Sequence, residues 1–160
     1  MPVAITSILD AIPQIVIAVD SNNEINYSNK AFHNFLPQYK PSIQNSISNF
    51  NEYLRKKVYI DPKNLLVLDR LASTGNDSFT EEFEFKWPNL NKTIFFLINV
   101  IPIQEKGSQI GKVIIFSDVT EYKHLINENI RKNESLSLMT QRLLEMRLSH
   151  NDATSCNEKP

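Results

Sequence analysis

The hydrophobic period of the chain changes at Phe79, and this change constrains the fold more than any other feature. From Phe79 to Trp87, aromatic residues occupy every second position except 81, where a glutamate stands. A period of two is typical of a strand that buries one face. Apolar runs follow at 93–103 and 110–117, each after a short polar turn. The pattern predicts three consecutive antiparallel strands.

The N-terminal part of the sequence predicts a hairpin between two short helices. Apolar residues at three- and four-residue spacings indicate a helix from about residue 3 to Pro13. Strands are predicted at 15–19 and 25–28, joined by a turn in which an asparagine can take a positive φ at little cost. Ser28 or Asn29 is then expected to cap the next helix.

Helical spacing returns in the middle of the chain. Apolar residues from 41 to 58 fall on one side of one helix, or of two short ones. Pro62 is placed to begin a further helix that ends before Gly75. Together with the strands, these segments predict an α+β domain with a five-stranded antiparallel sheet and helices on one of its faces.

Several of these strands are apolar on both faces, notably those around Ile17, Phe96 and Ile114. Such a sheet must be covered on both sides to keep its apolar surface from water. The middle helices can cover one face. We expect flanking helices or a second subunit to cover the other.

A long helix is predicted from 119 to 148, because this stretch has helical spacing and contains no glycine or proline. Apolar residues occupy the first and fourth positions of a seven-residue repeat at Tyr122, Leu125, Leu136, Met139, Leu143 and Met146. Asn129 and Lys132 interrupt the repeat, which indicates a register shift near residue 130. So short a stripe favours a supporting role in a dimer. The polar residues 149–160 are predicted to be disordered.

Composition narrows the class of protein. The chain has 160 residues and a formal charge of −1, with acids and bases interspersed, which argues against nucleic-acid binding. Its apolar runs are shorter than the roughly 20 residues of a membrane span, and its N-terminus lacks the pattern of a signal peptide. The single cysteine, Cys156, leaves no internal disulfide and no cysteine cluster for a metal. We expect a cytoplasmic protein with no metal site and no membrane contact.

Three motifs in the expected order resemble the PAS domain family. They are residues 8–20, residues 25–32, and Ile-Ile-Phe-Ser-Asp-Val-Thr-Glu at 114–121. They are similar to the family's opening helix and hairpin, its asparagine-capped core helix, and its closing strand with a D-(I/V)-T motif. The resemblance spans about residues 3–121. It divides the chain into an N-terminal flanking helix at 1–13, a PAS core at 14–118, a C-terminal signalling helix at 119–148 and a tail at 149–160.

The resemblance implies a signal-sensing and dimerisation module that serves an output domain such as a histidine kinase. Asp118 and Thr120 would relay changes in the core to the outgoing helix. A ligand pocket would lie between the sheet and the helices, with His33, Phe83, Phe85 and Phe96 as candidate lining residues. Aromatic residues at strand spacing are more often simply core. We expect a homodimer with a small-molecule ligand of unknown identity.

The residues argue against two cofactors that the family uses and against catalysis. The core has no cysteine for a flavin photoadduct, and His33 is a lone core histidine, which is weak support for haem. No phosphate-binding loop, metal-ligand spacing or nucleophile motif indicates an enzyme. Two alternatives stay open. One is a homodimerisation module without a ligand, and the weaker one is a small enzyme or carrier that uses the same cleft.

Overall fold

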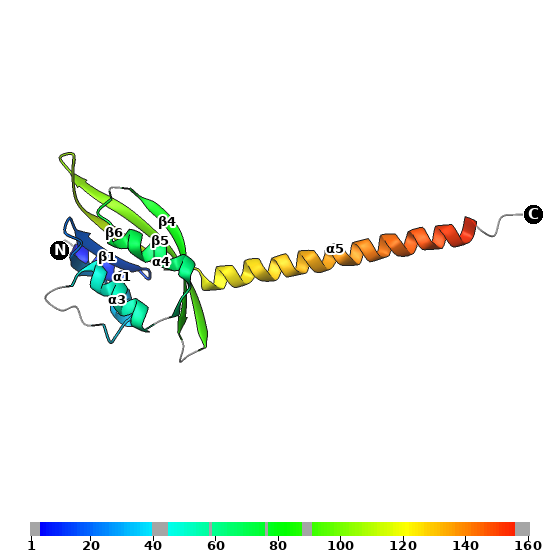
Figure 1. Ribbon diagram of the computed structural model, residues 1–160, viewed down its shortest axis with the longest axis horizontal. Helices are drawn as coiled ribbons and strands as arrows, with labels where there is room; N and C mark the ends of the chain where they lie inside the picture. The colour runs from blue at the N-terminus through cyan, green and yellow to red at the C-terminus, as the bar shows by residue number, and fades with distance from the viewer. Residues whose placement is uncertain (1–3, 40–44, 58, 76, 88–90, 156–160) are drawn as a thin grey trace, which may run out of the picture. The chain divides into compact units, whose positions relative to one another are not determined.

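One antiparallel sheet of six strands organises the first of two compact units, residues 1–120 (Figure 1). The computed structural model describes residues 4–39, 45–57, 59–75, 77–87 and 91–155. The strands lie in the order β2-β1-β6-β5-β4-β3. Their bounds are β1 Ile15–Asp20, β2 Ile25–Ser28, β3 Tyr59–Ile60, β4 Phe79–Trp87, β5 Lys92–Glu105 and β6 Ser108–Asp118.

The two halves of the chain meet in the centre of this sheet. Ile114 of β6 pairs with Ile17 of β1 on one side and with Val100 of β5 on the other. The N-terminal hairpin is confirmed, and its turn places Asn23 at a φ of 63°, as expected for an asparagine there. The three strands predicted between 79 and 117 are confirmed as well. The last strand is thus the one that joins the hairpin to the remainder of the sheet.

Gly111 allows the close pairing of β6 with β1. It lies opposite Asp20, and a Cβ atom at this position would overlap the carbonyl oxygen of Val19. A larger residue could be accommodated only by separating the two backbones. Glycine is therefore required here for close approach rather than for an unusual φ.

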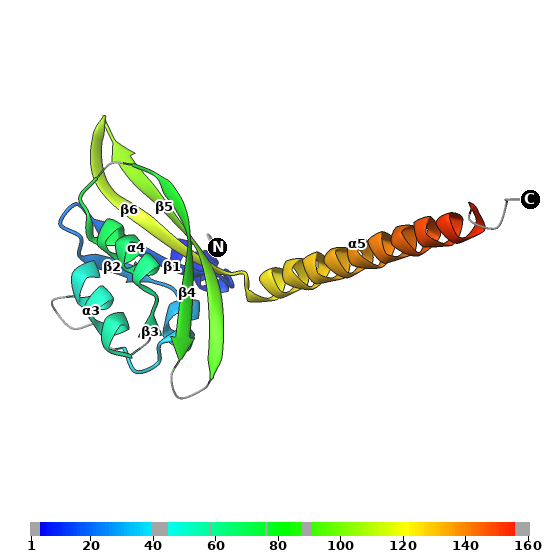
Figure 2. The ribbon, with the colours of Figure 1, turned by 45° about the vertical axis from the view of Figure 1, so that its right-hand side comes forward.

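Three helices cover one face of the sheet, as the sequence predicts (Figure 2). They are α2 (Lys30–Phe35), α3 (Ile47–Lys57) and α4 (Pro62–Ala72). Asn29 caps α2 by accepting a hydrogen bond from the N–H of Phe32, and Asp61 caps α4 in the same way through Lys63. Each helix buries apolar side chains against the inner face of the strands in one core. The inner face of the sheet is therefore closed within this chain.

Helix α1, Ile5–Ala11, lies within the predicted flanking segment and contributes no buried residue. Its apolar side chains Ile5 and Ile8 are 74% and 54% exposed. The helix is held to the core by polar bonds instead. Asp10 accepts hydrogen bonds from the N–H of Lys30 and from the hydroxyl of Tyr27.

The structure corrects the predicted strand count. Strand β3 has only two residues, which pair with Lys86 and Phe85 of β4 and make the sheet six-stranded rather than five-stranded. Two residues are too few to show a period in the sequence. The helix predicted to start near residue 41 begins at Ile47 as α3. Residues 40–44 lie outside the described part of the chain.

Helix α5, Thr120–Ser155, makes up the second unit from residue 121 onward. It is a continuous helix of 36 residues. It extends beyond the predicted end at 148, so the expected disorder does not hold for residues 149–155. These residues are polar, but they include no glycine or proline to end a helix. Residues 156–160 lie outside the described part of the chain.

Candidate functional site

The predicted relay residues lie where β6 ends and α5 begins. The Asp118 carboxylate accepts a hydrogen bond from the N–H of Thr120 at 2.9 Å. The Thr120 hydroxyl in turn accepts one from the N–H of Phe95 at 3.0 Å. Between them, Val119 donates its N–H to the carbonyl of Phe95 at 2.8 Å. The first helical N–H is satisfied by Asp118, and the junction is attached to one residue of β5.

This attachment point adjoins the core. Phe96 follows Phe95 along β5, pairs with Asp118 across the sheet, and is 3% exposed. Its ring contacts those of Phe85 and Phe116 at centroid distances of 5.3 and 6.0 Å, both edge to face. The residue that bonds the junction is thus adjacent in sequence to a ring of the aromatic core. The sequence offers no signal for Phe95, because only its backbone bonds to the junction.

The structure brings together three of the four residues predicted to line a ligand pocket. Phe83, Phe85 and Phe96 are all buried in the core. Phe83 and Phe85 approach to 4.4 Å between centroids, and Phe35 of α2 packs on Phe96 at 5.2 Å. The rings therefore contact one another where the sequence placed a pocket.

His33, the fourth predicted lining residue, lies apart from this cluster. It is on the exposed side of α2, where its Nε2 atom is 3.0 Å from the Ser28 hydroxyl oxygen. Its ring also meets the edge of Phe32 at 5.3 Å. The structure does not bring His33 together with Phe83, Phe85 and Phe96.

Asn29 forms more hydrogen bonds than the predicted helix cap requires. Its side chain is fully buried, and its Oδ1 atom accepts hydrogen bonds from the N–H groups of Val16 and Phe32. Its Nδ2 group donates to the carbonyls of Leu9 and Gln14 at 3.1 and 2.8 Å. One side chain thus joins α1, β1 and α2. The asparagine after the second strand is the sequence signal for the cap, but the spacing does not indicate the other bonds.

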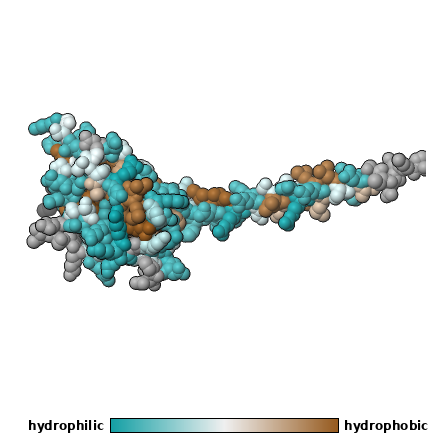
Figure 3. All heavy atoms as spheres, viewed as in Figure 1, coloured by the Kyte–Doolittle hydropathy of each residue, from teal (hydrophilic) through white to brown (hydrophobic). Residues whose placement is uncertain are grey.

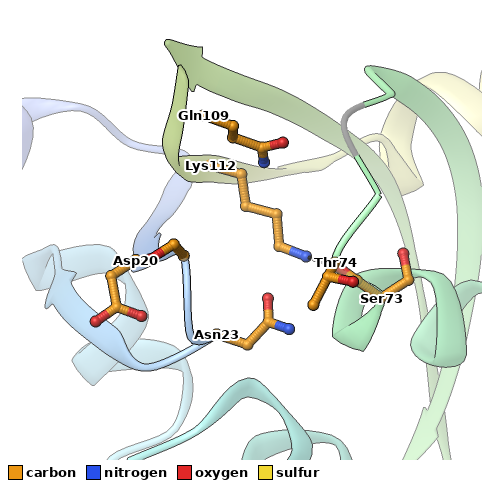
Figure 4. A pocket seen from close by; sticks show the side chains of 7 residues that line it. Asp20, Asn23, Ser73, Thr74, Gln109 and Lys112 are labelled. Carbon is orange, nitrogen blue, oxygen red and sulfur yellow. Dashed lines mark hydrogen bonds between the residues drawn. The ribbon is translucent and has the colours of Figure 1, made fainter. Parts of the chain in front are cut away.

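A second polar region, missed in the sequence, surrounds Lys112 at the far end of β6 (Figure 4). Lys112 is only 4% exposed, and its Nζ donates to the carbonyls of Leu71 and Ser73 at the end of α4, at 2.5 and 2.7 Å. Burial lowers the pKa of this ammonium from its ordinary value. The signal was present: Lys112 has the same strand parity as the buried residues Ile114 and Phe116.

Comparison with protein-family models found no match, and comparison with curated protein sequences found none either. Solved structures do match. The PAS domain of Bordetella pertussis BvgS has a TM-score of 0.54 and 16% identity, over 81% of this chain and 94% of that one. The PAS domain of the fruit-fly ELK potassium channel has a TM-score of 0.53 and 15% identity, over 72% and 94%. The chain therefore has a PAS fold.

An RNA-binding light-oxygen-voltage receptor is also similar, with a TM-score of 0.58 and 14% identity. The match covers 81% of this chain but 36% of the receptor. These identities are low, so the similarities establish the fold alone. Within the described residues, no group of three or more histidine, cysteine, aspartate or glutamate side chains is arranged to hold a metal ion. None of the described helices has the length and apolar character of a membrane span.

Proposed function

We propose that this chain is a signal-sensing and dimerising PAS module that passes changes in its core through residues 118–120 to helix α5. An output domain such as a histidine kinase would receive the change. The observation that carries this proposal is the pair of hydrogen bonds that Phe95 makes with Val119 and Thr120. Through them the first residues of α5 are bonded to a strand whose next residue, Phe96, packs in the aromatic core.

The surface of α5 supports self-association. The repeat residues Tyr122, Leu125, Leu136, Met139, Leu143 and Met146 are all exposed. Figure 3 shows apolar patches separated by polar surface along the helix. Every side chain from 127 to 153 is exposed. A second copy of α5 would bury this stripe, as in a coiled coil.

The outer face of the sheet offers a second apolar surface to a partner. Leu97, Val113 and Ile115 are half-buried there, and Ile101 is 49% exposed. Ile101 and Ile115 also line a hollow of roughly 430 Å³. We expected flanking helices or a second subunit to cover this face. The exposure of Ile101 favours a second copy of the chain.

The dimer is tested by replacing both leucines at one repeat position, Leu136→Asp with Leu143→Asp. The expected result is conversion of a dimer to a monomer, because each leucine loses roughly 1.5–3 kcal/mol of burial and gains a charge. Sedimentation velocity and native mass spectrometry would measure it. The matched control is Leu138→Asp with Leu144→Asp, which lie off the repeat and are equally exposed. A wild-type monomer, or dissociation of both variants alike, would contradict the proposal.

The relay is tested by a double-mutant cycle between Phe96→Leu and Thr120→Val. Phe96→Leu should increase amide hydrogen exchange in the first turns of α5. It should have a smaller further effect once Thr120→Val has removed one of the two bonds to Phe95, because part of the path between core and helix is then already broken. Thr140→Val, the same substitution within α5, serves as the control. Additive effects of the two changes would show that the junction does not couple core and helix.

One observation favours the alternative of a dimerisation module without a ligand. Phe83, Phe85 and Phe96 pack directly on one another, so that side chains occupy the region where a ligand was expected. The native mass spectrum separates the two functions. A dimer with added mass that is lost on denaturation supports sensing of a small molecule. A bare dimer supports the alternative.

A further inference from the structure

A small polar cavity lies between three segments that are distant in sequence: the β1–β2 turn, the end of α4 and the start of β6 (Figure 4). Its volume is roughly 100 Å³, and its walls include Ser21, Asn23, Ser73, Thr74, Gln109 and Lys112. One water molecule occupies about 30 Å³ of liquid, so the cavity has room for several non-hydrogen atoms. It is distinct from the aromatic core and from the junction at Asp118.

Lys112 places a buried positive charge in the wall of this cavity. Two of its three N–H donors are used by the carbonyls of Leu71 and Ser73. Among the residues that the structure describes, no carboxylate forms an ion pair with it. A buried ammonium without a counter-charge is costly, and a bound anion would reduce this cost.

Asp20 lines the cavity but does not supply the missing negative charge. Its Oδ1 atom accepts hydrogen bonds from the N–H groups of Asn22 and Glu24, at 2.8 and 3.0 Å. Figure 4 shows its carboxylate directed away from the Lys112 ammonium. The aspartate is therefore committed to stabilising its own turn.

Gln109, on the same strand as Lys112, has a side-chain oxygen that lacks a hydrogen-bond donor in the described part of the chain. Its Nε2 group donates to the carbonyl of Gly111 at 3.3 Å. Its Oε1 atom is buried and has no hydrogen-bond partner among the described residues. A buried acceptor without a donor destabilises the folded state, because it has lost its hydrogen bonds to water. The cavity therefore calls for an anion at Lys112 and a hydrogen-bond donor at Gln109.

We propose that this cavity binds a short carboxylate that carries a hydroxyl or amino group on the adjacent carbon. The carboxylate pairs with the free donor of Lys112 and accepts from the hydroxyl of Thr74, since the Ser73 hydroxyl already donates to the carbonyl of Arg70. The hydroxyl or amino group donates to Oε1 of Gln109. The proposal is independent of the signalling function above, since it concerns binding alone.

The probes are glycolate, glycine, acetate and glycolamide, titrated at constant ionic strength into the full chain labelled with ¹⁵N. We expect saturable amide shifts at residues 20–24, 73–75 and 109–112 with glycolate or glycine. The tighter binder of the two shows whether a hydroxyl or an amino group is the better donor to Oε1 of Gln109. Acetate should bind about fivefold more weakly, which is the effect of one hydrogen bond. Glycolamide, which matches glycolate in shape but has no charge, should produce no saturable shift.

Two variants assign the roles. Lys112→Met should abolish the glycolate shifts, whereas Lys92→Met, at an exposed lysine of β5, should leave them unchanged. Since Lys112 also bonds the end of α4, its loss can unfold the domain, and Gln109→Met provides a second test. In that variant glycolate and acetate should bind equally. The proposal is overturned by the absence of saturable shifts, by equal binding of glycolamide or acetate to the wild type, or by equal losses in the two lysine variants.

Discussion

The PAS unit, residues 1–120, and helix α5 are stabilised in opposite ways. In the PAS unit, side chains from five strands and three helices share one buried core. In α5, every side chain from 127 to 153 is exposed. The PAS unit is stabilised by its own buried core. Helix α5 has the regular structure of a helix without the packing that usually sustains one.

The difference predicts that α5 gains more stability from a partner than residues 1–120 do. Isolated helices are marginal in water because nucleation is costly and each added residue gains little. Ion pairs such as Glu128 with Lys132, at 2.8 Å and one turn apart, contribute only a few tenths of a kcal/mol. A dimer through the repeat would supply the missing burial. Substitutions in the two regions should accordingly have very different effects on the stability of one chain.

A leucine truncation should destabilise the protein strongly in the PAS unit and hardly at all in α5. Leu68→Ala in α4, at a side chain that is 0% exposed, should lower the free energy of unfolding of the PAS unit by about 2–5 kcal/mol. Leu138→Ala in α5, where the leucine is 57% exposed and lies off the repeat, should change it by less than about 0.5 kcal/mol. Urea unfolding followed by the fluorescence of Trp87 measures both. Equal losses would mean that α5 is part of the same cooperative unit.

A smaller effect should come from the polar centre of the PAS unit. Asn29→Ala removes the side-chain partner of the Val16 N–H and of the Gln14 carbonyl. The Phe32 N–H and the Leu9 carbonyl also lose a bond, but they keep backbone partners in the carbonyl of residue 29 and the N–H of Ile12. Leaving buried backbone groups unsatisfied costs about 1–3 kcal/mol each, partly recovered when water enters, so we expect a loss of about 2–4 kcal/mol.

The matched control for this change is Asn26→Ala, at an exposed position of β2, with an expected change of less than about 0.5 kcal/mol. Hydrogen exchange adds a more specific readout. The amides of α1 should exchange faster in Asn29→Ala, because Asn29 bonds the carbonyl of Leu9 near the end of that helix. Unchanged exchange in α1 would show that Asn29 does not hold this helix.

These buried polar residues mark the limit of prediction from the sequence. Apolar periodicity predicted the hairpin, the three long strands and the helices, because each leaves a repeating pattern along the chain. Asn29 could be predicted as a cap, but its bonds to α1 and β1 depend on segments that only the fold brings together. The same holds for Phe95, whose backbone carbonyl accepts a hydrogen bond from the N–H of Val119.

Lys112 was missed for a different reason. Its place on the inner face of β6 could be read from its parity with Ile114, but a single lysine in an apolar strand is easily taken for an exposed one. Its partners are the last carbonyls of α4, far away in sequence. Strand β3 was missed because two residues show no period. Pairings and short strands are decided by the tertiary structure, whereas periodicity reports only which side of an element is buried.

The smallest expected effect is a pH response confined to the PAS unit. Tyr39 donates a hydrogen bond to Asn45 at 2.6 Å, and its ring lies 4.9 Å from that of Tyr53. Burial, and secondarily the neighbouring Tyr53, raise the pKa of Tyr39 above its ordinary value. The folded state therefore keeps a proton that the unfolded state loses at about pH 10. The stability that Tyr39 contributes is complete below that pH and is lost as the pH rises further.

Tyr39→Phe keeps the ring but removes the titrating hydroxyl, so its free energy of unfolding should fall less steeply than that of the wild type between about pH 9 and pH 11. The difference should stay below about 1 kcal/mol, because the side chain is only partly buried and solvent screens its charge. Tyr122→Phe in α5, at a side chain that is 63% exposed, is the matched control and should follow the wild type. Urea unfolding of the PAS unit at each pH measures all three proteins. If Tyr122→Phe flattened the pH dependence as much as Tyr39→Phe, the effect would not come from the burial of Tyr39. The contrast between a buried and an exposed region would then fail.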